Sequence, residues 1–253
     1  MGGFVHDTLY SPSNKIGIGY CVVLPKTYYQ KEYADTTYPV IYFLHGYTGY
    51  ETADVWNAEY YYSQTAKGQF PEVIMVFPNG MNEWYINNAN GKTLIETHII
   101  HELLPFIDQK YRTNSSERGI TGFSMGGYGA VRYYLKYPGL FNYAVSIDGS
   151  LYAPEHVSLP DIMPSFGNIT NLNENSVYNL LDMVLENDSI LAGSLNILVL
   201  EGDHNGGKQF IEYAKGKGVN AQYFTEKLEH SPSLFYDRFW PEILQFEKEH
   251  LTK

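Results

Sequence analysis

The chain has 253 residues, of which 44% are hydrophobic and 18% charged, so it can bury a sizeable core and is not globally disordered. Seventeen Lys and Arg residues against 28 Asp and Glu residues give a formal net charge of −11. Nucleic acids and anionic membrane surfaces would repel such a chain. Neutral or weakly charged small molecules and polysaccharides remain open as partners.

Predicted strands and helices alternate from about residue 38 onward, after an N-terminal region, residues 1–37, that is typical of an antiparallel hairpin. Short β-branched and aromatic runs predict buried strands at residues 39–44, 72–77, 119–123, 141–147, 195–200 and 221–228. Hydrophobic residues at the helical period predict helices at residues 93–111, 126–137, 208–215 and 236–250. Pro105 is expected to kink the first helix or to break it locally.

This alternation predicts one domain over residues 1–253, with a mostly parallel, doubly wound sheet and helices on both faces. Residues 151–190 interrupt it with three prolines and an Asn-rich stretch, which indicates a small insertion forming a cap or a pocket wall. No apolar run is long enough to cross a bilayer. The sequence does not predict an oligomeric state.

The start of the chain lacks a charged and apolar leader. We expect either a cytoplasmic protein or, in preference, a secreted one whose leader was removed before Met1. The single cysteine, Cys21, lies in an apolar run and is predicted to be a core residue. One cysteine excludes an internal disulfide and a thiolate metal cluster.

The strongest chemical signal is Gly122-Phe123-Ser124-Met125-Gly126, a G-x-S-x-G motif between a predicted strand and a predicted helix. At such a turn the serine backbone is strained, its Oγ is exposed and the next amide, that of Met125, faces the developing oxyanion. The turn after the first core strand, His45-Gly46-Tyr47, is predicted to supply the second donor, the backbone N–H of Tyr47.

A serine nucleophile needs a base and an acid, which α/β-hydrolases supply in the chain order Ser, acid, His. His230 lies in a loop before the last predicted helix, where that fold delivers its base. Asp203 follows a predicted strand, so its carboxylate is predicted to accept the imidazole N–H. The alternatives are His204 for the base, and Glu201 and Asp148 for the acid.

Aromatic residues make up 16% of the chain, and Trp84-Tyr85 follow the second core strand on the same sheet edge as Ser124. They are predicted to form a wall that stacks on a sugar or a phenolic ring, with packing under a loop as the alternative. His45 is a further candidate for substrate contact, although bracing of its own loop is the favoured interpretation.

His98 and His101, with Glu102 beside them, raise the question of a metal site. The metalloprotease spacing is H-E-x-x-H, which these residues do not have. We therefore predict no metal and interpret them as polar residues at the edge of the core.

Four segments carry a more specific pattern than G-x-S-x-G alone. They are Leu44-His45-Gly46, Phe77-Pro78-Asn79-Gly80 with Trp84-Tyr85, Glu102-Leu103-Leu104-Pro105-Phe106-Ile107-Asp108 and Gly122-Phe123-Ser124-Met125-Gly126-Gly127. Together they resemble the esterase-D-like, or putative esterase, family. That family contains carbohydrate esterase family 1 feruloyl and acetylxylan esterases, S-formylglutathione hydrolases and mycolyltransferases. The resemblance runs from about residue 15 to about residue 245.

The resemblance implies the α/β-hydrolase fold and a reaction without a cofactor. It places the nucleophile on Ser124, the base on His230, the acid on Asp203 and the oxyanion amides on Tyr47 and Met125. The aromatic-rich, acidic chain looks most like a plant-cell-wall esterase, so we expect hydrolysis of hydroxycinnamoyl (feruloyl) esters of polysaccharide. The alternatives are an acetylxylan or short-chain esterase, less readily one like S-formylglutathione hydrolase, and a catalytically silent carbohydrate-binding fold.

Overall fold

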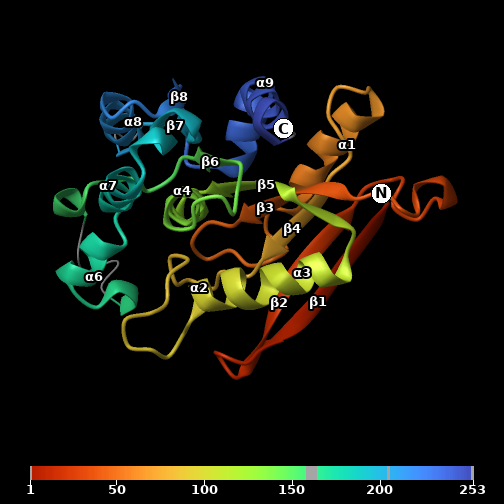
Figure 1. Ribbon diagram of the computed structural model, residues 1–253, viewed down its shortest axis with the longest axis horizontal. Coiled ribbons are helices and arrows are strands. Elements are labelled where there is room, and N and C mark those ends of the chain that lie inside the picture. The colour runs from red at the N-terminus through yellow and green to blue at the C-terminus, as the bar shows by residue number, and fades with distance from the viewer. Residues whose placement is uncertain (1, 158–163, 204–205, 252–253) are drawn as a thin grey trace.

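The computed structural model describes residues 2–157, 164–203 and 206–251. Within them an eight-stranded sheet has the order β1-β2-β4-β3-β5-β6-β7-β8 (Figure 1). The strands are β1 (Gly3–Ser11), β2 (Ile16–Leu24), β3 (Tyr38–Leu44), β4 (Ile74–Pro78), β5 (Thr113–Phe123), β6 (Tyr143–Ile147), β7 (Asn196–Glu201) and β8 (Asn220–Thr225). β2 pairs antiparallel with both β1 and β4, and the other pairs are parallel.

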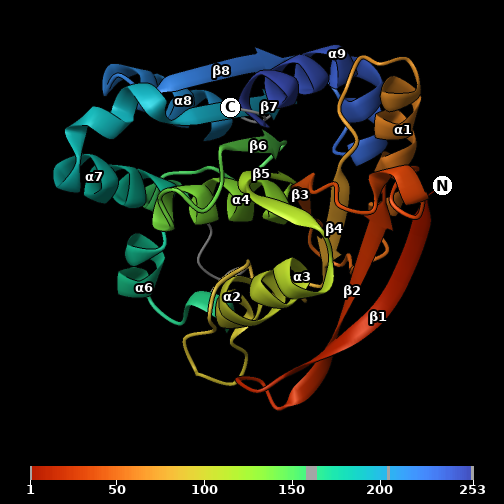
Figure 2. The same ribbon diagram turned by 45° about the vertical axis from the view of Figure 1, so that its right-hand side comes forward.

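Helices cover both faces of this sheet, as Figures 1 and 2 show from two directions. They are α1 (Ala58–Ala66), α2 (Ile95–Thr97), a π-helical segment (His98–Leu103), α3 (Leu104–Lys110), α4 (Met125–Lys136), α6 (Ile169–Glu174), α7 (Val177–Asn187), α8 (Gly206–Gly216) and α9 (Pro232–Leu251). Short 3-10 turns lie at Lys31–Tyr33, Val55–Asn57, Pro154–His156 and Ser189–Ser194. The predicted mostly parallel α/β sheet with helices on both faces is confirmed.

The sheet is central because its middle strands are apolar on both faces. All seven residues of β3 are buried. Val40 and Tyr42 face the core under α2–α4, α7 and α8, whereas Ile41 and Phe43 face the core under α1 and α9. A strand buried on both sides requires such a continuous apolar run. Because β3 to β8 pair in parallel, their carboxyl ends meet at one edge of the sheet.

The insertion lies between β6 and β7, as predicted, and contributes helices α6 and α7. Buried residues of α7 fall at the helical spacing and are Val177, Leu180, Leu181 and Val184. They join the core cluster that also contains α4. The insertion is therefore packed against the helix that follows Ser124. Over the described residues, no helix is both long and apolar enough to span a membrane.

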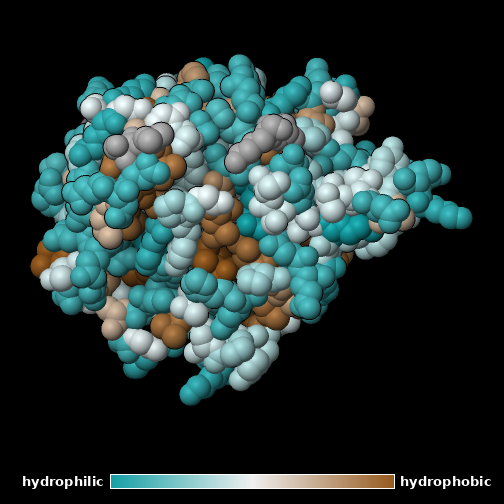
Figure 3. All heavy atoms as spheres, viewed as in Figure 1, coloured by the Kyte–Doolittle hydropathy of each residue, from teal (hydrophilic) through white to brown (hydrophobic). Residues whose placement is uncertain are grey.

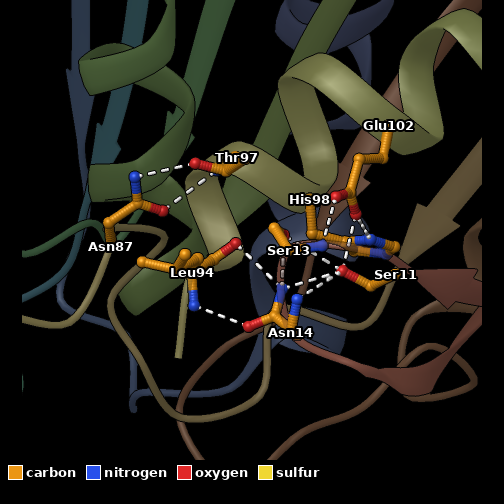
Figure 4. Close-up of polar contacts among 8 residues, drawn as sticks. All are labelled: Ser11, Ser13, Asn14, Asn87, Leu94, Thr97, His98 and Glu102. Carbon is orange, nitrogen blue, oxygen red and sulfur yellow. Dashed lines mark hydrogen bonds and ion pairs between the residues drawn. The ribbon is translucent and has the colours of Figure 1, made fainter. Parts of the chain in front are cut away.

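Side chains fasten the tip of the β1–β2 hairpin to the π-helical segment (Figure 4). Glu102 accepts hydrogen bonds from Ser11 Oγ at 2.6 Å and from the Ser13 N–H at 2.9 Å. Its carboxylate also lies 2.9 Å from His98 Nδ1. Partial burial favours the neutral acid, but these hydrogen bonds outweigh it and lower the pKa of Glu102 to about 2. The carboxylate therefore serves as an anchor for the hairpin.

Two asparagines extend this anchoring to the start of α2 (Figure 4). Asn14 donates to the Leu94 carbonyl at 3.1 Å and accepts from the Leu94 N–H at 2.6 Å. Asn87 accepts from the Thr97 N–H at 3.0 Å and donates to Thr97 Oγ1 at 2.9 Å. The loop between β4 and α2 is thereby tied to the helix that follows it.

The π-helical segment lies within the helix predicted over residues 93–111, just before Pro105. Pro105 lies at the start of α3, so the irregular turn directly precedes it and takes the place of a simple proline kink.

His98 is bound to Glu102, and the His101 ring packs 5.9 Å from the Tyr137 ring. Among the described residues there is no group of three or more His, Cys, Asp or Glu side chains that could hold a metal ion.

Candidate active site

Ser124 lies at the turn between β5 and α4 with φ 54° and ψ −116°, so its φ is positive, in the left-handed half of the φ/ψ map. Glycines make this turn possible because neighbouring backbone comes very close. A Cβ on Gly122 would lie 2.2 Å from the Gly126 carbonyl oxygen, and one on Gly126 would lie 1.9 Å from the Leu44 carbonyl oxygen. The G-x-S-x-G motif thus packs the serine turn directly onto the end of β3.

Three side chains form a hydrogen-bonded chain at this turn. Ser124 Oγ lies 2.9 Å from His230 Nε2, and His230 Nδ1 lies 2.5 Å from Asp148 Oδ2. The Phe123 ring packs against the imidazole with ring centroids 4.6 Å apart. A carboxylate on Nδ1 keeps the proton there, so Nε2 can accept the serine proton.

Asp148 comes from the end of β6 and is buried, with φ 48°. Its second oxygen, Oδ1, accepts a hydrogen bond from the Gly202 N–H at 2.9 Å. Gly202 directly follows β7. The carboxylate therefore bridges two neighbouring strand ends, and both of its oxygens have partners.

The structure corrects the prediction that Asp203 contacts His230. The Asp203 side chain is 61% exposed, and its carboxylate lies 3.7 Å from Lys227 Nζ. Glu201, the other candidate at this strand end, caps α8 by accepting from the Gly207 and Lys208 N–H groups at 2.6 and 3.0 Å. Chain position alone favours Asp203, whereas in the structure its carboxylate lies at the surface beside Lys227. His204, the alternative base, lies outside the described residues.

Met125 and the loop that carries Tyr47 both lie next to the serine. Met125 is the first residue of α4, so its N–H has no intrahelical acceptor. The loop carrying Tyr47 passes beside the serine, because a Cβ on Gly46 would lie 3.5 Å from Ser124 Cβ. The Thr48 N–H donates to Asn82 Oδ1 at 2.7 Å, which fastens this loop to the one after β4.

His45 is 2% exposed and holds its own loop. The Gly80 N–H donates to Nε2 at 2.9 Å, so Nδ1 carries the proton and donates to the Gly46 carbonyl at 2.8 Å. Burial lowers the pKa of His45, which favours this neutral tautomer. Both ring nitrogens are thus engaged inside the protein, which agrees with the favoured interpretation that His45 braces its own loop and corrects the other one, contact with substrate.

Trp84 and Tyr85, predicted together as a stacking wall, have different environments. Tyr85 is 0% exposed, which corrects its predicted contact with substrate, and its hydroxyl donates to the His45 carbonyl at 2.9 Å. Trp84 is partly buried and lines a pocket. Consecutive residues diverge here because both have left-handed backbone, with φ 53° and 55°.

That pocket has a volume of about 330 Å³ and a mainly apolar lining. Its lining residues are Trp84, Tyr128, Ser150, Tyr152, Pro154, His156, Val157, Phe166, Leu172 and Ser176. Tyr128 lies one helical turn beyond Ser124, and Ser150 lies two residues beyond Asp148, so the pocket adjoins the serine site. On the face seen in Figure 3, hydrophobic residues are visible in a hollow near the centre, surrounded by hydrophilic ones.

Aromatic rings connect the loop after β3 with this pocket. The Trp84 ring lies 6.4 Å from the Tyr47 ring, 5.9 Å from the Tyr128 ring and 6.4 Å from the Phe166 ring. Such spacings are typical of interacting aromatic side chains. Phe166 and Tyr128 had not been predicted, since a single aromatic residue in an insertion or a helix gives no signal of a pocket.

Backbone strain is concentrated at this edge of the sheet. Left-handed residues other than glycine follow four successive parallel strands and are Thr48, Met81, Trp84, Tyr85, Ser124 and Asp148. Residues held in this region cost about 1–3 kcal/mol each and are commonest at functional sites. The strain therefore supports the assignment of the site independently of the hydrogen-bonded chain.

The chain is similar to several known proteins. A family model described as putative esterase matches residues 11–178. Esterase Rv1288 of Mycobacterium tuberculosis is 35% identical over 136 residues, which cover 52% of this chain and 29% of the relative. An endo-1,4-beta-xylanase/feruloyl esterase of Xylanibacter ruminicola is 29% identical over 133 residues, which cover 49% and 18%. The chain thus spans less than a third of the length of these curated relatives.

Among solved structures, a ferulic acid esterase superposes with a TM-score of 0.81 and 26% identity, and the match covers 98% of both chains. An S-formylglutathione hydrolase from Agrobacterium tumefaciens has a TM-score of 0.78 at 19% identity, and the match covers 98% of this chain and 95% of that one. At that identity the second match shows a common fold only.

Proposed function

Because this chain belongs to the putative esterase family, we propose that it is a serine esterase with Ser124 as nucleophile, His230 as base and Asp148 as acid. The observation that carries this proposal is the hydrogen-bonded chain from Ser124 Oγ through His230 to Asp148. The strained serine turn and the adjoining pocket support it.

In the proposed reaction Ser124 Oγ attacks the ester carbonyl carbon while His230 Nε2 takes the hydroxyl proton. Amides of Tyr47 and Met125 donate to the resulting oxyanion. The imidazolium, stabilised by Asp148, then protonates the leaving alcohol as the C–O bond breaks and an acyl-enzyme remains. His230 next deprotonates a water molecule that attacks the acyl carbon, and the acid leaves as Ser124 regains its proton.

For the acyl group we favour a hydroxycinnamoyl, or feruloyl, moiety of plant cell-wall polysaccharide. An aromatic ring suits an apolar pocket of about 330 Å³ lined by Trp84, Tyr128 and Phe166. The similarity to a ferulic acid esterase and to a xylanase/feruloyl esterase points the same way. Acetylated xylan and other short-chain esters are the alternative substrates.

The test compares hydrolysis of methyl ferulate and p-nitrophenyl acetate by the wild-type protein and by Ser124→Ala. Loss of the nucleophile should lower turnover by at least about 10⁴-fold. Ser63→Ala, an exposed serine on α1, is the matched control and should keep wild-type activity. Ferulate turnover that depends on Ser124 supports both mechanism and acyl group. Turnover of p-nitrophenyl acetate alone would indicate that the substrates are short-chain esters. Activity retained in Ser124→Ala would exclude Ser124 as the nucleophile.

A further inference from the structure

Tyr85 is enclosed between two glycines from different elements. A Cβ on Gly80, in the loop after β4, would lie 2.3 Å from the Tyr85 ring, and a Cβ on Gly129, in α4, would lie 2.6 Å from it. Neither glycine has a positive φ, so each is required by the close approach of the ring rather than by backbone conformation. The loop and the helix are thus both shaped around this one side chain.

Both ends of Tyr85 are held by hydrogen bonds. Its hydroxyl donates to the His45 carbonyl at 2.9 Å, and its own carbonyl accepts from Arg132 Nη1 at 3.1 Å. Arg132 is itself fully buried and paired with Glu96 at 2.7 Å. The Tyr85 hydroxyl is therefore held at the end of β3, and the Tyr85 backbone is held by Arg132 of α4.

The hydrogen bond between Tyr85 and His45 affects the orientation of the peptide unit between Gly46 and Tyr47. His45 Nδ1–H donates to the Gly46 carbonyl, and that carbonyl belongs to the same peptide unit as the Tyr47 N–H. In a trans peptide the C=O and N–H point in opposite directions. An anchor on the carbonyl therefore sets the direction of the N–H. His45 is fixed at its ring by Gly80 and at its carbonyl by Tyr85.

We propose that Tyr85 is a positioning residue, which acts through His45 to aim the Tyr47 N–H at the oxyanion. This inference rests on the proposed esterase function. Tyr85 is fully buried and does not touch substrate, so its contribution is to transition-state stabilisation and not to substrate binding. Its loss should therefore lower kcat and leave KM nearly unchanged.

The test is Tyr85→Phe, which removes the hydroxyl and keeps the ring. A neutral hydrogen bond of about 0.5–1.5 kcal/mol corresponds to a fall in kcat of roughly two- to tenfold. Tyr133→Phe is the matched control. Tyr133 is also fully buried, its ring lies 6.2 Å from that of Tyr85, and its hydroxyl has no hydrogen-bond partner among the described residues. This control should keep wild-type kcat, and thermal unfolding of both variants reports on their folding.

A second readout separates positioning from a general structural role. A boronic acid that forms a tetrahedral adduct with Ser124 should bind Tyr85→Phe more weakly, by the same factor as the loss in kcat/KM. The product acid, which has no tetrahedral oxyanion, should bind both proteins equally. A third variant, His45→Phe, removes the relay, so adding Tyr85→Phe to it should cause little further loss in kcat.

The outcomes distinguish the two proposals. If wild-type protein hydrolyses neither ester and its serine does not react with a fluorophosphonate probe, the proposed function fails. If wild-type protein is active and Tyr85→Phe matches Tyr133→Phe in kcat and boronate affinity, the positioning role fails while the esterase stands. A Tyr85→Phe loss that is confined to KM, or that is undiminished in the His45→Phe background, also overturns the role of Tyr85.

Discussion

Asp148 uses both carboxylate oxygens, one toward His230 and the other toward the Gly202 N–H. The side chain is buried, so its orientation is set by the ends of β6 and β7 rather than by solvent. A carboxylate held in this way can fix the imidazole tautomer and stabilise the imidazolium formed during the reaction. Asp203, on the neighbouring strand end, has neither the contact nor the burial for that role.

The two aspartates can be compared directly by the same substitution. Asp148→Asn should lower kcat by about 10³–10⁴-fold, because an amide neither holds the tautomer nor stabilises the imidazolium. Asp203→Asn should remain within about twofold of wild type, since its exposed pair with Lys227 contributes little. Steady-state kinetics with p-nitrophenyl acetate measure both. A larger loss of kcat in Asp203→Asn than in Asp148→Asn would instead identify Asp203 as the acid.

Some of the candidate site residues could be predicted from the sequence, and others could not. Ser124 could be predicted because a motif of glycines surrounds it, and His230 because it lies in the loop before the last helix. The proposed acid could not, since Asp148, Glu201 and Asp203 all lie at the ends of core strands and all carry a carboxylate. The deciding quantities are a left-handed φ and a side-chain direction, which no spacing in the sequence reports.

The elements around the site are joined by one buried arginine. Arg132 of α4 pairs with Glu96 of α2 at 2.7 Å and donates to the Tyr85 carbonyl at 3.1 Å. Its Nε also donates to Asn175 Oδ1, just after α6, at 3.0 Å. One side chain thus links the helix behind the serine, the loop after β4 and the insertion.

Breaking this junction should destabilise the protein strongly. Arg132→Leu leaves the Glu96 carboxylate buried, although Lys136 Nζ still lies 2.6 Å from it. We expect a loss of about 3 kcal/mol in the free energy of unfolding, measured by urea denaturation at pH 7. Arg238→Leu is the control, because Arg238 is about half exposed and pairs with Glu226 at the surface, so it should cost less than about 1 kcal/mol. Equal losses in the free energy of unfolding for the two variants would mean that the buried contacts of Arg132 contribute no more to stability than a surface ion pair.

Helix prediction depended on how clearly the buried residues repeat. Hydrophobic residues at the helical period predict the helix over residues 126–137, and it is α4 in the structure. Helix α7 was not predicted, although Val177, Leu180, Leu181 and Val184 have the helical spacing, because the surrounding prolines and asparagines suggested an irregular insertion. Helix α1 buries only Ala58 and Tyr61, so its run of tyrosines shows no period.

Across the whole molecule, Glu247 joins the last helix to the sheet and to the first helix. This α9 residue is fully buried and accepts hydrogen bonds from Tyr61 Oη of α1 and Thr121 Oγ1 of β5, each at 2.7 Å. Burial raises the pKa of Glu247 from 4.5 to about 7, even though these hydrogen bonds oppose the shift. The folded protein therefore retains a proton that the unfolded chain loses.

Stability should consequently fall as pH rises from about 4.5 to about 7, because the native state binds the extra proton in that window. A shift of this size corresponds to about 3 kcal/mol. Urea unfolding at pH 5 and pH 8 measures the change, and Glu247→Gln should show about 3 kcal/mol less of it than wild type. The difference between the two proteins isolates Glu247 from the other titrating groups. Identical pH dependences would show that Glu247 does not titrate in this range.

The left-handed residues at the strand ends have a consequence for adaptation to heat. Replacing Thr48 or Met81 with glycine would relieve backbone strain but would also loosen the loops beside the serine. Lys15 also has a positive φ, 58°, but lies in the hairpin turn between β1 and β2. Selection for thermal tolerance can therefore relieve strain at Lys15 at little cost to turnover, whereas at the strand ends it must exchange catalytic rate for stability.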